Sequence, residues 1–168
     1  MKVALVLALF LLGIAWASCA PTPALWAKMV RYASGFGVDP LLLYALVWEE
    51  SRFCVNARGA KGEVGLGQVR PVAAKQVGVP AAYLSDPDWN LYATAKYLRY
   101  LYDRYRDWEK ALVAYNGGPS RLDSGNPPAS SRQYARRILS TYRLLRQWVG
   151  GSNPSGPATM ETQNFTPR

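Results

Sequence analysis

At the start of three apolar-periodic segments, a residue that commonly caps helices stands directly before a proline. The three pairs are Thr22-Pro23, Asp39-Pro40 and Asp86-Pro87. A short oxygen-bearing side chain at the N-cap accepts a hydrogen bond from the first helical turn. Proline fits that turn because it lacks an N–H group that the helix would leave unpaired there. The pairs predict helices over 23–33, 40–53 and about 88–105.

The remaining segments add further helices and one region that cannot be helical. Apolar spacing predicts helices at 72–77, 80–83, 108–115 and, rich in arginine, about 131–149. Four glycines between residues 56 and 70 predict an irregular loop or a small β-hairpin. A loop rich in Pro, Gly and Ser is predicted over 117–130. The fold class is therefore mainly α, in one domain over about 22–149.

The two ends of the chain have compositions of their own. Residues 1–17 combine an early lysine, an apolar run and an A-x-A pattern, which is the layout of a secretory signal peptide. The apolar run is short for a membrane span, although an uncleaved anchor is the alternative. Residues 150–168 are poor in apolar residues and predict a flexible tail. We therefore expect an exported, periplasmic or extracellular protein.

Composition excludes several classes of site. The chain has no histidine and only two cysteines, which removes histidine-based triads and multi-cysteine zinc sites, so no metal or other cofactor is predicted. A net charge of +9 favours a polyanionic partner such as nucleic acid, anionic lipid or an acidic wall polymer. The sequence carries no nucleic-acid-binding motif, and export makes nucleic acid an unexpected partner.

The two cysteines, Cys19 and Cys54, leave three possibilities. In an oxidising compartment they could form a disulfide, and the alternative is two unpaired thiols. Cys19 also follows the apolar run as a lipidated cysteine would, although Trp16 fits poorly three residues before it. Membrane association is expected only if the signal stays uncleaved or Cys19 is lipidated.

Two adjacent carboxylates, Glu49 and Glu50, end the predicted helix over 40–53. At about 100° per residue, Glu50 falls about 20° from Leu43, in the apolar stripe, and Glu49 falls about 120° away. Glu49 is therefore predicted to be a solvated surface charge. Desolvation and the negative end of the helix dipole would both raise the pKa of Glu50, which suits a general acid. The alternative is a buried ion pair between Glu50 and Arg52, Arg58 or Arg70.

Four segments follow Glu50-Ser51 in a fixed order. They are Gly65-Leu66-Gly67-Gln68-Val69 with Pro71, Asn90-Leu91 with Ala95 and Tyr97-Leu98, Ala114-Tyr115-Asn116-Gly117-Gly118, and Arg132-Gln133-Tyr134. In order and spacing they resemble the soluble lytic transglycosylase family, relatives of goose-type lysozyme, over about residues 24–148. The resemblance implies a lysozyme-like helical fold with a groove for peptidoglycan glycan strands. We expect a monomer.

The resemblance also implies a reaction. Glu50 would protonate the oxygen between N-acetylmuramic acid and N-acetylglucosamine. It would then act as base on the C6 hydroxyl of the same muramic sugar, giving a 1,6-anhydro product without water. The acetamido group of the substrate would supply the stabilisation that other glycosidases take from a second carboxylate.

Five further residues match the family motifs. Ser51 is expected to fix the local backbone, with an exposed helix serine as the alternative. Gln68 would hydrogen-bond substrate, with an amide that satisfies its own loop as the alternative. The Tyr115 hydroxyl would reach the catalytic glutamate, with a core aromatic at a helix end as the alternative. Asn116 is expected to cap its helix, which is compatible with contacting sugar. Tyr134 would line the groove or pack in the core.

The chain departs from the family pattern at three positions. It has Gly59 where the family often has serine, Gly67 where it has methionine, and Ser130 where it has an acidic residue. The first and third departures bear on hydrogen bonds that would support the acid.

Glu63 opens a second enzymatic possibility. It occupies the place at which chicken-type lysozymes carry a second carboxylate. A separation of about 5–5.5 Å from Glu50 would permit a retaining hydrolysis. The alternatives to a lytic transglycosylase are thus a lysozyme-type hydrolase using Glu50 and Glu63, or a non-cleaving peptidoglycan-binding or assembly module. The combination of Glu50, Gln68 and Tyr115 argues against the last.

Overall fold

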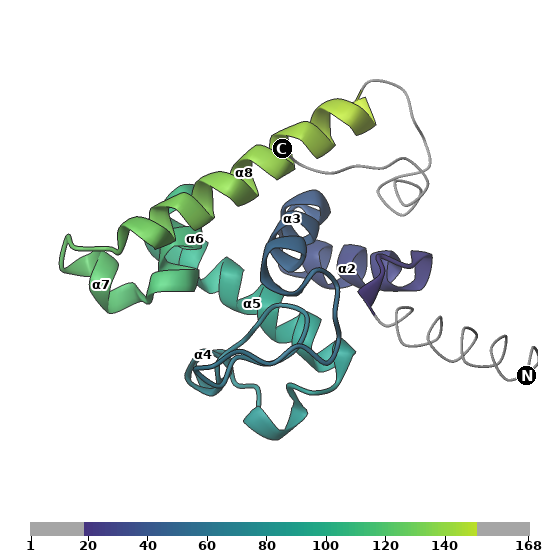
Figure 1. Cartoon of the computed structure of the whole chain (residues 1–168), viewed down its shortest axis with the longest axis horizontal. Helices are drawn as coiled ribbons and strands as arrows, with labels where there is room; N and C mark the ends of the chain where they lie inside the picture. Colours follow the sequence, from purple (N-terminus) through teal and green to yellow (C-terminus); the bar gives the residue numbers. More distant parts are fainter. Residues whose placement is uncertain (1–18, 151–168) are drawn as a thin grey trace, which may run out of the picture.

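The computed structural model describes residues 19–150. The predicted signal peptide and the tail beyond Gly150 lie outside the described residues. Between them the chain forms α2 (Pro23–Gly35), α3 (Pro40–Ser51), α4 (Pro71–Gln76), the 3-10 helix η2 (Ala81–Tyr83), α5 (Pro87–Tyr105), α6 (Trp108–Gly117), α7 (Pro119–Asp123) and α8 (Ala129–Gly150) (Figure 1). The mainly helical fold class is confirmed.

The three predicted caps begin three of these helices. The Thr22 hydroxyl accepts from the Leu25 N–H at 3.2 Å, and the Asp39 carboxylate accepts from the Leu41 N–H at 2.9 Å. The Asp86 carboxylate accepts from two successive N–H groups of the first turn of α5. Each cap satisfies donors that a helix start leaves without an intrahelical partner.

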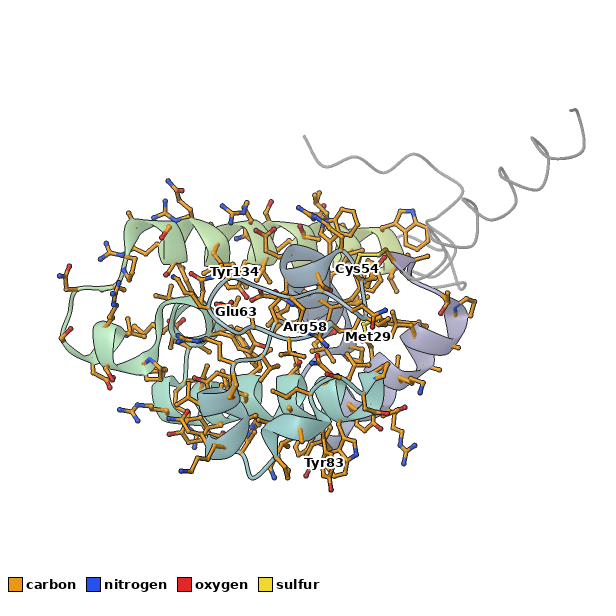
Figure 2. All side chains as sticks on the ribbon, turned by 60° about the horizontal axis from the view of Figure 1, so that its bottom comes forward. Met29, Cys54, Arg58, Glu63, Tyr83 and Tyr134 are labelled. Atoms are coloured by element: carbon orange, nitrogen blue, oxygen red, sulfur yellow. A yellow bond between two sulfur atoms is a disulfide. The ribbon has the colours of Figure 1, made fainter. Side chains whose placement is uncertain are left out.

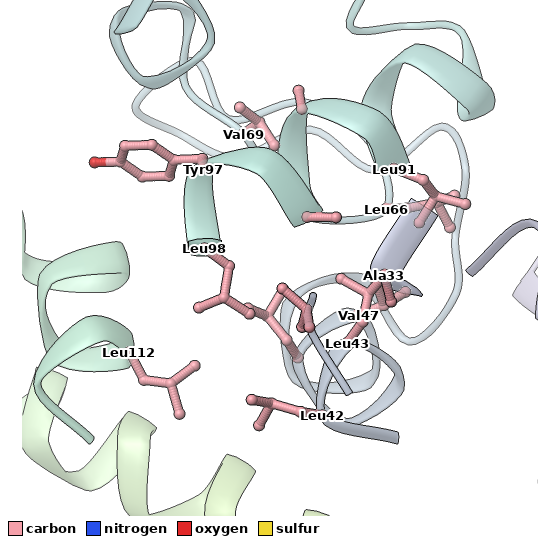
Figure 3. Packing of buried hydrophobic residues seen from close by; sticks show 14 of the residues in the cluster. Ala33, Leu42, Leu43, Val47, Leu66, Val69, Leu91, Tyr97, Leu98 and Leu112 are labelled. Carbon is pink, nitrogen blue, oxygen red and sulfur yellow. The ribbon is translucent and has the colours of Figure 1, made fainter. Parts of the chain in front are cut away.

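Helix α3 lies in the middle of the fold. Residues 42–47 are all buried, and six consecutive residues cover more than one full turn. The helix is therefore enclosed on all sides, and the prediction of a single apolar stripe is wrong. Helices α2 and α8 pack against α3, and α6 packs against both α5 and α8. Figure 3 shows residues of α3, α5 and α6 meeting in the core.

Residues 56–70 form an irregular loop, as predicted. Two isolated β-bridges pair Val64 with Arg58 and with Val69, and no strand forms in the described part of the chain. The buried side chain of Asn90, on α5, holds this loop in place. Its amide nitrogen donates to the carbonyls of Val64 and Leu84 at 2.8 Å each, and its oxygen accepts from the Gly67 N–H at 2.9 Å.

Some boundaries differ from the predicted ones. Helix α3 ends at Ser51, because Arg52 and Phe53 both adopt left-handed backbone angles, with φ of 51° and 63°. This turn sends Phe53 into the core, where it is 1% exposed. The predicted loop over 117–130 contains the short helix α7 and the first residues of α8.

A disulfide joins Cys19 to Cys54, directly after the turn that ends α3. It decides among the three possibilities for the cysteines, since a sulfur in a disulfide carries no lipid. Of the helices between residues 19 and 150, none has both the length and the apolar content that a membrane crossing requires.

Candidate active site

Glu50 occupies the last turn of α3, with its side chain partly buried. The hydroxyl of Tyr134, on α8, donates a hydrogen bond to its Oε1 at 2.5 Å. Burial raises the pKa of Glu50 to about 7; the Tyr134 bond opposes this rise, and the charges of Glu49 and Glu63 add to it. Near neutral pH the carboxyl group can therefore exist in both its protonated and its ionised form.

The alternative of a buried ion pair for Glu50 is wrong. Within residues 19–150, none of the ion pairs involves Glu50. The Arg52 guanidinium stacks over the Trp48 ring at 4.2 Å. Arg58 donates to a backbone carbonyl and to the Ser85 hydroxyl instead. The carboxyl group therefore keeps the raised pKa that burial gives it.

Glu49 is not the solvated surface charge that the sequence predicted. Its side chain is only 15% exposed and forms an ion pair of 2.7 Å with Arg137 of α8. The prediction failed because α8 covers the face of α3 that the helical wheel assigned to solvent. Helix α8 thus contacts both glutamates, through Tyr134 and, one turn later, through Arg137.

A cavity of about 340 Å³ opens in front of Glu50. Its walls come from the end of α3, the loop over 56–70, α4, α5 and the α6–α7 junction. Five of the residues singled out in the sequence line it, namely Glu50, Glu63, Gln68, Tyr115 and Asn116. The other two, Tyr134 and Ser51, do not line the cavity but contact residues around it. Tyr134 is buried against Glu50, and the Ser51 hydroxyl donates to the Val47 carbonyl one turn earlier on α3.

Tyr115 and Tyr134 form hydrogen bonds that the sequence did not predict. The Tyr115 hydroxyl donates to the Gly67 carbonyl at 2.8 Å rather than to Glu50, so this tyrosine fixes the loop. Tyr134 packs in the core, which was one of its two expected places, and its hydroxyl makes the bond to the glutamate. Burial raises the pKa of both phenols well above 10, and the charge of Glu50 adds to it, so both remain hydrogen-bond donors.

Two amide side chains lie at opposite walls of the cavity. Gln68 has a left-handed backbone, with φ of 45°, and its amide nitrogen donates to the Gly65 carbonyl at 2.9 Å. Asn116 accepts from the Ser131 hydroxyl at 2.8 Å, which ties α6 to α8. The expectation that Asn116 caps α6 is wrong, because the helix continues to Gly117 and Gly118, with φ of 90°, is its C-cap.

Glu63 lines the same cavity from the loop. Its Oε2 accepts from the Lys61 N–H at 2.8 Å, so the side chain folds back over its own loop. This arrangement explains one departure from the family pattern. A Cβ atom at Gly59 would lie 2.3 Å from Oε2 of Glu63, so a serine there would displace the carboxylate.

Sequence reasoning missed several walls of the cavity. The residues concerned are Arg70, Val72, Ala73 and Gln76 around α4, and Pro119 and Ser120 at the start of α7. No motif marks them, and only the packing of α4 and α7 brings them together. Tyr97, part of the Tyr97-Leu98 motif, also lines the cavity, with its ring 5.4 Å from that of Tyr115. Between residues 19 and 150, no group of three or more acidic or cysteine side chains is placed to hold a metal.

The chain is similar to several known proteins. The model of the transglycosylase SLT domain matches residues 29–137. The chain is 33% identical over 129 residues to the transglycosylase of Enterobacteria phage PRD1, covering 77% of this chain and 46% of the relative. It is 30% identical over 138 residues to the X polypeptide of Escherichia coli, covering 76% of this chain and 77% of the relative.

A solved structure also matches. It is an inactive glutamate-to-glutamine mutant of the lytic transglycosylase Slt from Pseudomonas aeruginosa, with a TM-score of 0.65 and 26% identity, covering 76% of this chain and 25% of that one. This chain therefore spans about half of the phage protein and a quarter of Slt. The matched segment contains Glu50, Gln68, Tyr115 and Tyr134. The chain belongs to the transglycosylase SLT domain family and has its lysozyme-like helical fold.

Proposed function

We propose that this protein is a peptidoglycan lytic transglycosylase that cleaves the β-1,4 bond between N-acetylmuramic acid and N-acetylglucosamine. The observation that carries the proposal is the environment of Glu50: one carboxyl group, facing a cavity, with its pKa raised to about 7. The names of the phage transglycosylase and of Slt support it. The glutamine in the inactive form of Slt is in keeping with an essential glutamate in that relative.

The reaction needs one group that first gives a proton and then takes one. Protonated Glu50 donates its proton to the glycosidic oxygen as the bond to C1 of the muramic sugar breaks. The resulting carboxylate accepts the proton of the C6 hydroxyl of that sugar, whose oxygen bonds to C1. The product is a 1,6-anhydro sugar, Glu50 ends protonated, and no water is consumed.

The neighbours of Glu50 suit both steps. A pKa near the working pH lets one carboxyl group serve as acid and base at comparable cost. The hydrogen bond from Tyr134 stabilises the carboxylate that exists between the two proton transfers. Because the first step needs the protonated form, we expect the rate to fall as the pH rises above about 7.

A lysozyme-type hydrolase is the second candidate, favoured by one observation. Glu63 lines the cavity that Glu50 faces, and its charge raises the pKa of Glu50. Its carboxylate, however, accepts a hydrogen bond from the backbone of its own loop, which weakens a nucleophile. A non-cleaving module would not need a buried carboxyl group in front of a cavity, since such a group destabilises the fold when it ionises.

The products of peptidoglycan digestion separate these candidates. Purified peptidoglycan is treated with the wild type, Glu50→Gln and Glu63→Gln, and the fragments are read by mass spectrometry. We expect anhydro-muropeptides from the wild type and from Glu63→Gln, and a rate lower by about 10²- to 10⁴-fold for Glu50→Gln. Reducing ends that require both glutamates would establish the hydrolase, and an intact polymer after wild-type treatment would leave the binding module.

The partner and place of action follow from the same proposal. The ligand is the glycan strand of peptidoglycan, and the protein acts as a monomer in the periplasm or outside the cell. The disulfide between Cys19 and Cys54 fits an oxidising compartment. The net charge of +9 favours approach to an anionic wall.

A further inference from the structure

A cluster of aromatic side chains lies where α2 and η2 meet the start of α5. The Trp89 ring contacts Tyr83 at 5.2 Å and Tyr92 at 5.7 Å, and Tyr92 contacts Tyr32 at 6.2 Å, between ring centroids. Tyr83 and Trp89 remain 48% and 42% exposed. We call these four residues the aromatic platform.

The aromatic platform is separate from the site that holds Glu50. None of its four residues lines the 340 Å³ cavity. Figure 2 shows Tyr83 at the lower edge of the molecule, away from Glu63 and Tyr134. Neighbouring aromatic rings left this exposed lose the stabilisation that burial would bring, and such patches commonly mark binding surfaces.

A hollow of about 230 Å³ adjoins the platform, and Tyr32, Trp89 and Tyr92 line it together with Asp88. The Asp88 carboxylate accepts a hydrogen bond from the Tyr32 hydroxyl at 2.9 Å and forms an ion pair with Lys28. The hollow thus combines aromatic walls with a fixed polar group at its edge, which is the usual make-up of a small-ligand site.

The charges around the hollow limit what can bind. A cationic ligand would compete with Lys96, which lies over the Tyr92 ring at 5.2 Å, and with Arg31, over the Tyr32 ring at 5.6 Å. Asp88, the acidic residue of the hollow, is already paired with Lys28. The cations Lys28, Arg31 and Lys96 outnumber the one acidic residue here, so charge disfavours a cationic ligand. The aromatic walls favour a ligand that has both an apolar face and polar edges.

We propose that the aromatic platform binds an N-acetylated glycan strand, as a second polysaccharide site apart from the Glu50 cavity. A sugar ring presents electropositive C–H groups on its faces, which suit the negative faces of Trp89 and Tyr83. Its hydroxyl and acetamido groups lie at the edge, within reach of donors and acceptors such as Lys28 and Asp88. The choice of glycan rests on the proposed function, whereas the site itself does not.

The test measures retention on insoluble peptidoglycan, in a protein that cannot cleave it. Glu50→Gln is the background, to which Trp89→Ala, Tyr83→Ala or, as a control, Leu144→Ala is added. Leu144 is 47% exposed on α8, outside the platform. We expect each platform substitution to weaken retention by roughly two- to tenfold, the value of one aromatic contact, and Leu144→Ala to leave it unchanged.

A second measurement separates binding from folding and from self-association. Trp89→Phe keeps an aromatic face and should keep most of the retention, and in the background with active Glu50 all platform variants should cleave short soluble glycans at the wild-type rate. Equal retention by all variants would overturn the proposal. So would a wild-type dimer that Trp89→Ala dissociates, because a second copy would then cover the platform. The retention and dimerisation measurements do not depend on whether the wild type cleaves peptidoglycan.

Discussion

The cavity in front of Glu50 has two unlike walls, each with a glutamate. On the helix wall, formed by the end of α3 with α8 packed behind it, Glu50 is partly buried, and burial raises its pKa to about 7. On the loop wall, residues 56–70, Glu63 folds back onto the backbone of its own loop. One wall is built from packed helices and the other from glycine turns held by Asn90.

Glu50 and Glu63 are the same type of residue, but their surroundings differ. An enclosing helix pair removes water from a carboxyl group and favours its protonated form. On the loop wall, the Glu63 carboxylate instead accepts a hydrogen bond from the Lys61 N–H. A proton donor therefore belongs on the helix wall. The following variants test whether the two walls differ in this way.

The largest expected effect is on the pH dependence of stability. The pKa of Glu50 rises from 4.5 to about 7 on folding, so between these values the folded protein binds more protons than the unfolded chain. Its stability therefore falls as pH rises through this range and loses about 3 kcal/mol by pH 8.5. Since glutamine cannot ionise, Glu50→Gln should be more stable than the wild type by about that amount at pH 8.5 and equally stable near pH 4.

Urea unfolding at the two pH values measures this difference. Glu63→Gln is the matched control from the loop wall. It should keep most of the fall in stability because the Glu50 carboxyl group is still present. The loss should be slightly smaller, since the Glu63 charge no longer raises the pKa of Glu50. A Glu50→Gln variant no more stable than the wild type at pH 8.5 would show that the helix wall does not desolvate this residue.

The next effect concerns the packing of the loop wall. A Cβ atom at Gly67 would lie 2.0 Å from the Thr94 hydroxyl oxygen, and Thr94 is fully buried. Gly67 is also held on both sides, by Asn90 through its N–H and by Tyr115 through its carbonyl. Gly67→Ala should therefore destabilise the fold by about 1–3 kcal/mol, the usual cost of overpacking.

Gly35→Ala provides the comparison, since no atom lies within 4 Å of a Cβ placed there in the last turn of α2. That variant should be neutral or slightly stabilising in thermal unfolding. If the clash is the cause, adding Thr94→Ala to Gly67→Ala should cost less than the sum of the two separate changes. Strict additivity of the two changes in unfolding free energy would contradict a clash between the new Cβ atom and Thr94.

The sequence predicted the helices well because caps act locally. Thr22, Asp39 and Asp86 each cap the helix that they were expected to begin. The raised pKa of Glu50 was predicted for a partly wrong reason. Periodicity predicted an apolar stripe, whereas α3 is enclosed on all sides, which is why Glu49 was misplaced.

Contacts between distant segments could not be read from the sequence. Tyr115 and Tyr134 are both motif tyrosines, and which of them reaches Glu50 depends on how α6 and α8 pack around α3. The same holds for Arg137, 88 residues beyond Glu49 along the chain. The motifs identified both tyrosines, but the residue that each of them contacts depends on the three-dimensional arrangement.

The smallest expected effect separates the two tyrosines, one for each wall. Tyr134 donates to Glu50, and this bond lowers the pKa of Glu50 against the effect of burial. Tyr134→Phe should raise that pKa further, so the fall in rate at alkaline pH should begin at a higher pH. The rate on the acidic side should change by less than about tenfold, since one hydrogen bond is worth roughly 1 kcal/mol.

Tyr115→Phe removes a bond to the loop and none to Glu50. It should lower the rate and the stability slightly while leaving the alkaline limb where the wild type has it. The two pH–rate profiles, measured on the same peptidoglycan, therefore assign each hydroxyl to its wall. A shift of the limb with Tyr115→Phe and none with Tyr134→Phe would reverse the assignment, and Glu50 would then depend on the loop wall for its protonation.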